Sequence, residues 1–136
     1  GGAAIADGLK GNSTLQLLRI DTGMFSDRYV GLPIDKLKGT KPTKKIDLSR
    51  RGLGVASAII IASCIKENGV LKELNLRGNT IGDKGASALA AILKETRICQ
   101  LDLYGNEIGY YGACALAAVL KETQITTLNL ARNQLC

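Results

Sequence analysis

Histidine and tryptophan are absent from the 136-residue sequence, and phenylalanine occurs once. Without histidine the chain cannot form a Ser-His or Cys-His nucleophile pair, and a zinc site would have only cysteine and carboxylate ligands. Residues 52–57, GLGVAS, lack the final glycine of a dinucleotide-binding fingerprint. These absences predict that the protein is not an enzyme and that it has no catalytic residues, no metal site and no cofactor.

No Cys-x-x-Cys spacing occurs among the four cysteines, which favours free thiols in a reducing compartment and a cytoplasmic location. Cys64 and Cys114 are expected to pack inside helices, and Cys99 to lie at an outward or edge position; the fourth cysteine is Cys136. The longest apolar run, residues 55–65, is far shorter than the roughly 20 residues that cross a bilayer. We therefore predict no membrane partner.

A repeat of 27 or 28 residues runs through the chain. Residues 71–97, LKELNLRGNTIGDKGASALAAILKETR, align without a gap with residues 98–124, ICQLDLYGNEIGYYGACALAAVLKETQ. We predict a single domain divided into a partial repeat helix (1–14), an irregular repeat (15–42), three regular repeats (43–70, 71–97 and 98–124) and a partial repeat (125–136). Because one unit cannot bury its apolar face alone, we expect a fragment of a longer array, with possible end-to-end association through uncapped repeats.

Each unit begins with the pattern L-x-x-L-x-L-x-x-N. Its period of two predicts a short strand with leucines on a buried face and polar side chains on the other, and five such strands are expected. The paired apolar positions are Leu18 and Ile20, Ile46 and Leu48, Leu74 and Leu76, Leu101 and Leu103, and Leu128 and Leu130. The asparagine after the strand (Asn79, Asn106 and Asn133) is expected to form a structural ladder that satisfies backbone groups in the loops.

The second half of each unit predicts a helix. In the copy from residue 71, Ala86, Leu89, Ala90 and Leu93 fall on one helical face, and Asp83 is expected to favour the start of the same helix. Alternation of strands with helices requires parallel strands with all helices on one side. The predicted fold class is therefore α/β, a curved solenoid.

Together, L-x-x-L-x-L-x-x-N-x-I-G and G-A-x-A-L-A-x-x-L-K resemble the leucine-rich repeats of the ribonuclease-inhibitor-like subfamily, and most closely those of NOD-like receptors. The resemblance covers residues 43–136 and implies a right-handed β-α superhelix, a horseshoe segment with parallel strands on its concave face and helices on its convex face. Residues 1–42 match less well, because Gly23 stands at the ladder position, as Arg51 does in the next unit. Here we expect a short helix near residues 33–37, followed by an extended basic link through Lys38, Lys41, Lys44 and Lys45.

Outward positions on the strands are the predicted binding surface, and Arg77 beside Tyr104 is the kind of pair that anchors interfaces. The candidate binding residues are Arg19, Lys45, Asp47, Ser49, Glu73, Asn75, Arg77, Gln100, Asp102, Tyr104, Thr127 and Asn129. The alternative interpretation is a solvated sheet face.

The predicted function is a module that binds a protein partner through the concave face. A GTPase-activating or regulatory role of the Ran GTPase-activating type, and a purely structural scaffold segment, are the alternatives. The net charge of +6 and the basic residues between Lys36 and Arg51 permit an acidic partner, although a solvated loop is the simpler interpretation. Nucleic acid is not the expected partner, because no stacking aromatics accompany these residues.

Overall fold

Four short strands form a parallel sheet in the order β3 (Lys45–Asp47), β4 (Glu73–Asn75), β5 (Gln100–Asp102) and β6 (Thr127–Asn129). Ile46 pairs with Leu74, Leu74 with Leu101, and Leu101 with Leu128, so each strand is in register with the equivalent position of the next unit. The computed structural model describes residues 1–21 and 29–135, and Gly23 and Cys136 lie outside them. Parallel pairing is thus confirmed for four of the five predicted strands.

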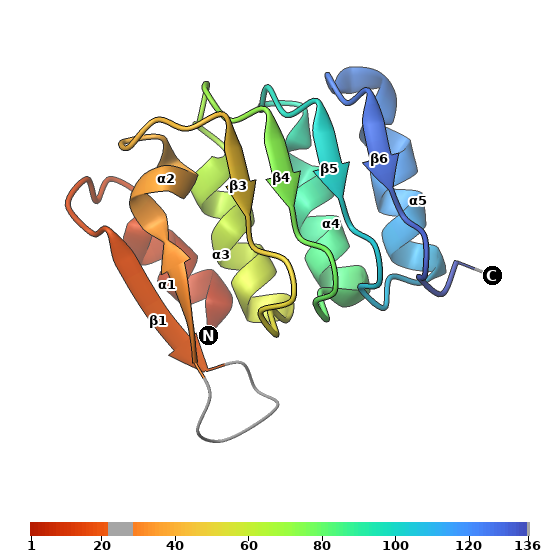
Figure 1. Cartoon of the computed structure of the whole chain (residues 1–136), viewed down its shortest axis with the longest axis horizontal. Coiled ribbons are helices and arrows are strands. Elements are labelled where there is room, and N and C mark those ends of the chain that lie inside the picture. Colours follow the sequence, from red (N-terminus) through yellow and green to blue (C-terminus); the bar gives the residue numbers. More distant parts are fainter. Residues whose placement is uncertain (22–28, 136) are drawn as a thin grey trace.

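The helices α3 (Val55–Ile65), α4 (Gly82–Leu93) and α5 (Tyr110–Val119) connect these strands and lie together on one face of the sheet (Figure 1). A short 3-10 helix, η1 (Leu120–Glu122), follows α5. On α4 the four residues predicted for one face are all buried: Ala86, Leu89, Ala90 and Leu93. The core between sheet and helices is formed by leucine, isoleucine and alanine, as the scarcity of aromatic residues requires.

Glycine brings neighbouring helices into close contact. A Cβ atom on Gly85 of α4 would lie 2.3 Å from Ile81 Cγ2 and 3.0 Å from the Cβ of Ala58 in α3. At the equivalent position of α5, a Cβ on Gly112 would lie 3.1 Å from the Cβ of Ala86. The glycine and alanine of the G-A-x-A pattern therefore set the distance between helices of successive units.

The first predicted strand does not join the parallel sheet. Instead β1 (Leu17–Asp21) pairs antiparallel with β2 (Tyr29–Pro33) in a separate two-stranded sheet. The segment from Tyr29 to Pro33 buries Val30 and Leu32 between more exposed neighbours, which is a period-two strand pattern in place of a repeat helix. The prediction of a fifth parallel strand was therefore wrong, because a local hairpin partner replaces the neighbouring repeat.

Two further helices pack near this hairpin. The predicted partial helix is α1 (Gly2–Leu9), which packs against α3, and the predicted short helix is α2 (Ile34–Lys38). Lys38 is the last residue of α2 and not part of an extended link, because the helix ends only at Gly39, whose φ is +83°. The Lys38 ammonium donates hydrogen bonds to the carbonyl oxygens of Leu9 and Asn12. The bond to Leu9 places a cation at the carboxyl end of α1, where the helix leaves carbonyl groups unpaired.

The described cysteines are free thiols. Cys64 is buried in α3 as expected, and burial raises the pKa of its thiol to about 11. Cys99 is half-buried, whereas Cys114 is exposed on α5. The prediction that Cys114 packs internally was wrong, because it occupies the same helical position as the exposed Ser87 in the preceding unit.

Candidate binding face of the parallel sheet

The face of the sheet opposite the helices, here called the open face, carries the outward side chains of β3 to β6. Its first column, at the amino ends of the strands, contains Lys45, Glu73, Gln100 and Thr127. Its second column contains Asp47, Asn75, Asp102 and Asn129. Its third column, just beyond the strands, includes Ser49, Arg77 and Tyr104. The structure thus brings together all the predicted binding residues except Arg19.

In the structure Arg19 lies on β1, outside the parallel sheet. Its guanidinium carbon lies 5.1 Å from the ring centroid of Tyr29 on β2, a cation–π contact within the hairpin. A hollow of about 290 Å³ is lined both by Gly31 and Pro33 of this hairpin and by residues of β3. Arg19 is therefore not part of the open face, and its assignment to that face was wrong for the same reason as the assignment of its strand.

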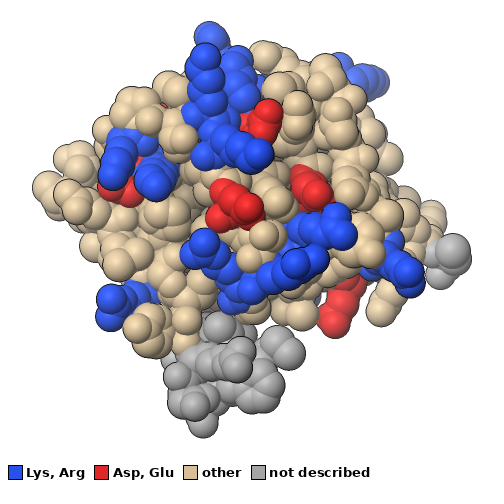
Figure 2. Space-filling model, viewed as in Figure 1, with Lys and Arg blue, Asp and Glu red and all other residues tan. Residues whose placement is uncertain are grey.

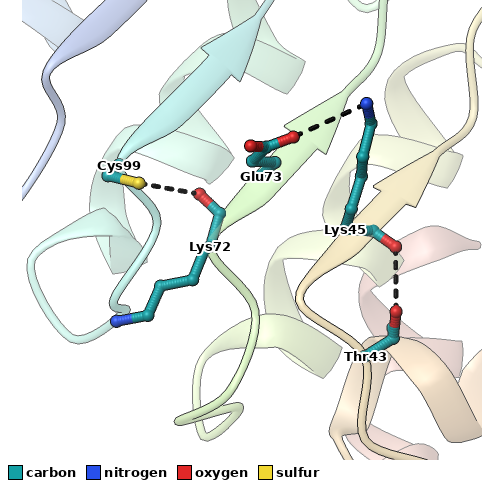
Figure 3. A network of polar contacts seen from close by, with 5 residues as sticks. All are labelled: Thr43, Lys45, Lys72, Glu73 and Cys99. Carbon is teal, nitrogen blue, oxygen red and sulfur yellow. Dashed lines mark hydrogen bonds and ion pairs between the residues drawn. The ribbon is translucent and has the colours of Figure 1, made fainter.

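The first column contains an ion pair across two strands. Lys45 Nζ lies 3.6 Å from Glu73 Oε2; the Lys45 side chain is exposed and that of Glu73 is partly exposed, so water screens the pair and it contributes little to stability. Figure 3 shows the Glu73 carboxylate directed toward Lys45, whereas the side chain of Lys72 extends away from it. In the same view, Cys99 Sγ donates to the Lys72 carbonyl at 3.5 Å and Thr43 Oγ1 donates to the Lys45 carbonyl at 3.1 Å.

The second column has a structural role that the sequence analysis missed. In every strand the side-chain Oδ1 of this column accepts a hydrogen bond from the backbone N–H two residues later. The four bonds run from Ser49 to Asp47 (2.9 Å), Arg77 to Asn75 (3.0 Å), Tyr104 to Asp102 (2.9 Å) and Ala131 to Asn129 (3.1 Å). Each is an Asx turn that ends the strand, so one acceptor position of each Oδ1 is already occupied before any partner binds.

Hydrogen bonding also affects ionisation in this column. The pKa of Asp47 is lowered, mainly by the bond from the Ser49 backbone, with further contributions from the Ser49 hydroxyl and the positive charges of Arg51 and Lys45. Because Asp47 is exposed, water screens these charges and the energetic effect is small. The carboxylate is nevertheless ionised at neutral pH and contributes negative charge to the middle of the open face.

Arg77 and Tyr104, two residues beyond the ends of the neighbouring strands β4 and β5, form the pair expected in the third column. The Arg77 guanidinium carbon lies 3.8 Å from the centroid of the Tyr104 ring, and both residues are half-buried. Stacking on the ring holds the guanidinium plane in one place while leaving its N–H groups available. This is an ordered cationic site at the carboxyl end of the sheet.

A shallow hollow of about 250 Å³ crosses all four strands. Its lining is mainly first-column and second-column residues: Lys45, Glu73, Leu74, Asn75, Gln100, Leu101, Asp102, Thr127 and Asn129. Figure 2 shows this face, with carboxylates near its centre and lysine and arginine side chains around them. The hollow offers polar groups of both charge signs along with hydrogen-bonding amides.

The three asparagines after the strands bond across successive units. Asn79 Oδ1 accepts from the N–H groups of Arg51 and Leu53, both at 3.0 Å, and its Nδ2 donates to the Leu48 and Leu76 carbonyls. Asn106 and Asn133 repeat this arrangement with the loops of β4 and β5. Since Asn79 and Asn106 are buried, their amides satisfy loop groups that water cannot reach.

Two other polar residues join the units. The sequence analysis missed Asn68, and for Asp83, which lies in the first turn of α4 as expected, it missed the bonds to the next helix. Asn68 is buried; its Nδ2 donates to the Lys36 and Leu37 carbonyls, and its Oδ1 accepts from the N–H groups of Val70 and Leu71. Asp83 caps the next helix and not its own, as discussed below. For Asn68 the available signal was a polar residue at the end of an apolar helix, at a position where the following units carry threonine.

Within residues 1–21 and 29–135, no group of three or more acidic or cysteine side chains is arranged to hold a metal ion. None of the helices in the same ranges is long and apolar enough to cross a membrane.

Comparisons with known proteins address the repeat and the fold. A family model described as Leucine Rich repeat matches residues 68–90, which include β4 and most of α4. The chain contains a leucine-rich repeat. The structure described as "Leiomodin-1 Actin-Binding Site 2 (ABS2)" is similar to this chain with a TM-score of 0.69 and 24% sequence identity, over 75% of this chain. The chain spans 61% of the length of that structure, and the likeness shows a shared leucine-rich-repeat type of fold. No curated protein matches by sequence.

Proposed function

We propose that this chain is a protein-interaction module that binds its partner through the open face. The observation that carries the proposal is the hollow of about 250 Å³ across β3 to β6, which is lined by polar side chains of all four strands. A leucine-rich repeat and a shared fold with a structure described as an actin-binding site support the protein-binding class. In this proposal the open face is the concave face of a ribonuclease-inhibitor-like solenoid, and residues 43–70, 71–97 and 98–124 are its complete repeats.

Arg77 and Tyr104 are the proposed anchors. An aromatic ring with a stacked guanidinium presents a large contact area at low entropic cost, which is why such residues dominate binding energy at interfaces. The Lys45–Glu73 pair and the amides of Gln100 and Asn75 lie on the same face and would supply polar contacts around that anchor. The module is not proposed to be catalytic, and no observation favours the GTPase-activating alternative.

Affinity purification from an extract of the source cells tests the proposal. The test variant carries Arg77→Glu and Tyr104→Ala, and the control carries Lys84→Glu and Ala91→Ser on the exposed side of α4. We expect one protein to be lost from the test variant and retained by the control. Retention of every captured protein by the test variant would contradict binding through the open face.

Actin is the first defined partner to test, because the leiomodin-1 structure is described as an actin-binding site. The measurement is co-sedimentation of the wild type with filaments and gel filtration with monomeric actin. Binding that the Arg77→Glu, Tyr104→Ala variant loses would identify actin as the partner. Absence of binding would leave the module with a different protein partner, to be named by the affinity purification.

A further inference from the structure

Two arginines occupy backbone positions that favour glycine. In the turns after β4 and β5, Gly78 and Gly105 have φ values of +69° and +62°. At the equivalent positions after β3 and β6 stand Arg50 and Arg132, with φ values of +54° and +58°. A left-handed conformation costs an L-residue other than glycine about 1–2 kcal/mol. Glycine fits this position in the other two turns without that cost, so backbone conformation alone does not explain why two of the four turns carry arginine.

These arginines belong to a positively charged row at the carboxyl end of the sheet. The four turns contain Arg50, Arg51, Arg77 and Arg132 but only one acidic residue, Glu107. None of these arginines forms an ion pair with another residue in the described ranges. Figure 2 shows a band of lysine and arginine side chains along one edge of the open face, beside the carboxylates at its centre. Cations grouped in this way without partners repel one another, and a bound anion would relieve that repulsion.

Between Arg50 and Arg132 the two intervening turns carry glycines, Gly78 and Gly105, which add no side chains to the surface. The side chain of Arg50 lies against Gly78, since a Cβ on that glycine would be 2.9 Å from Arg50 Cγ. A Cβ on Gly105 would have its nearest neighbour 4.0 Å away, at the Gly78 Cα, so the space over this turn is open. Arg77 and Tyr104, which stack on each other, directly precede these two glycines in the chain. An extended backbone could therefore approach Gly105 closely, with the Arg50 side chain over Gly78 on one side and Arg132 on the other.

We propose that this row, here called the arginine row (Arg50, Arg77 and Arg132 around the open turn at Gly105), binds an acidic peptide segment of the partner protein. The inference rests on the proposed function and names the chemistry of the partner. Guanidinium groups recognise carboxylates through paired N–H donors, which is the reason for arginine at these positions in place of glycine. The carboxylates of Asp47, Glu73 and Asp102 in the middle of the open face would repel an acidic segment and keep it on the row.

The distance between strands determines how far apart the acidic residues of the peptide should be. Arg50 and Arg132 are separated by three strand spacings, or about 14 Å at the usual ~4.8 Å between strands. An extended peptide advances about 3.4 Å per residue, so two acidic residues four positions apart would match the two arginines. A nucleic-acid backbone fits less well, because its closely spaced phosphates would also meet the carboxylates at the centre of the face, and Tyr104 is the only aromatic residue among these turns.

The test is fluorescence anisotropy with a labelled 12-residue peptide of alanine, serine and two glutamates four positions apart, at low ionic strength. The main variant carries Arg50→Gly and Arg132→Gly, which gives these turns the residue that β4 and β5 already use and should preserve the fold. A second variant with Arg50→Gln and Arg132→Gln removes the charges while keeping side-chain length. The control, Lys84→Ala and Lys94→Ala, removes the same charge from exposed positions in the first turn of α4 and directly after its last residue.

We expect both arginine variants to bind the peptide at least tenfold more weakly than the wild type, and the lysine control to bind within twofold. A peptide with the same composition but adjacent glutamates should bind at least threefold more weakly. Equal binding by the wild type and both arginine variants, or tighter binding of a 12-nucleotide single-stranded DNA than of the peptide, would overturn the inference. Failure of this inference can be distinguished from failure of the proposed function. The peptide titration depends on Arg50 and Arg132, whereas the affinity purification depends on Arg77 and Tyr104.

Discussion

The carboxylate of Asp83, in the first turn of α4, accepts a hydrogen bond of 2.8 Å from the backbone N–H of Gly112, in the first turn of α5. The same oxygen accepts a second bond, of 2.7 Å, from the N–H of Gly109. The N–H groups at the start of a helix have no partner within it and attract negative charge. One repeat therefore caps the helix of the next, which ties adjacent units together by a polar contact as well as by apolar packing.

Replacing Asp83 with alanine should lower the free energy of unfolding by about 1–2 kcal/mol, the usual effect of losing a side-chain cap. Asp83→Asn keeps the acceptor but loses the charge beside the helix end, so its loss should be about 0.5 kcal/mol. Urea unfolding measures both values, with Lys84→Ala as the control at an exposed neighbour. Equal stability of the wild type and Asp83→Ala would show that this contact does not hold the units together.

Gly85→Ala should destabilise the protein even though alanine is the better helix former. The new methyl group would lie 2.3 Å from Cγ2 of Ile81, one turn earlier in the chain, and 3.0 Å from the Cβ of Ala58 in α3. Both contacts are too short, so α4 would have to shift at a cost of about 1–3 kcal/mol. The matched change is Gly8→Ala in α1, where no atom lies within 4 Å of the new Cβ and a gain of about 0.5–1 kcal/mol is expected. Thermal unfolding of both variants checks this prediction, and a stabilised Gly85→Ala would contradict the close helix contact.

Asn79→Ala should lower the free energy of unfolding by about 2–4 kcal/mol, because it leaves several buried backbone groups without partners. Asn129→Ala removes a single exposed hydrogen bond, to the Ala131 N–H, and should lower it by less than about 1 kcal/mol. The comparison separates the buried asparagine ladder from the Asx turns of the second column. Similar losses in the two variants, measured by urea unfolding, would be evidence against a ladder that holds the loops.

The lowered pKa of Asp47 should make the free energy of unfolding depend slightly on pH. Because the folded protein lowers its pKa, the ionised carboxylate stabilises the fold above the pKa of the unfolded chain, and this stabilisation is lost as pH falls through the folded pKa. Asp47→Asn keeps the acceptor for the Ser49 N–H, as Asn75 and Asn129 do in other repeats. Between about pH 6 and pH 2.5 the wild type should therefore lose more stability than Asp47→Asn, by less than about 1 kcal/mol. The opposite ordering in urea unfolding would mean that the Asx turn does not favour the carboxylate.

The repeat made the parallel sheet, the positions of the helices and their buried faces predictable, because each of these depends on residues within one unit or at a fixed spacing from the next. The side-by-side placement of Arg77 and Tyr104 followed from the same register. The hairpin of β1 and β2 was not predicted, because residues 15–42 were interpreted as an irregular repeat whose second half is a short helix and an extended link; Gly31 and Pro33 are both unfavourable in a long helix. Val30 and Leu32 alternate with them and carried the strand signal.

Contacts between side chains and backbone were harder to predict than the elements themselves. An aspartate at the start of α4 is compatible with capping its own helix or the next one, and only the distance between stacked helices decides in favour of α5. Asp47 and Asp102 were considered as surface groups for a partner, because a sequence pattern does not distinguish an outward side chain in solvent from one bonded to the N–H two residues later. The backbone conformation of Arg50 and Arg132 is likewise visible only in the structure.

The central claim, that a partner protein occupies the open face, is tested most directly by placing a photo-crosslinking amino acid at one position at a time. The first position is Gln100, exposed on β5 in the middle of the first column, and the second is Ala91, exposed on α4. After irradiation in an extract of the source cells, the account predicts a crosslinked partner from position 100 and none from position 91. A crosslink from position 91 with none from position 100 would contradict it and would place the interaction surface on the helices.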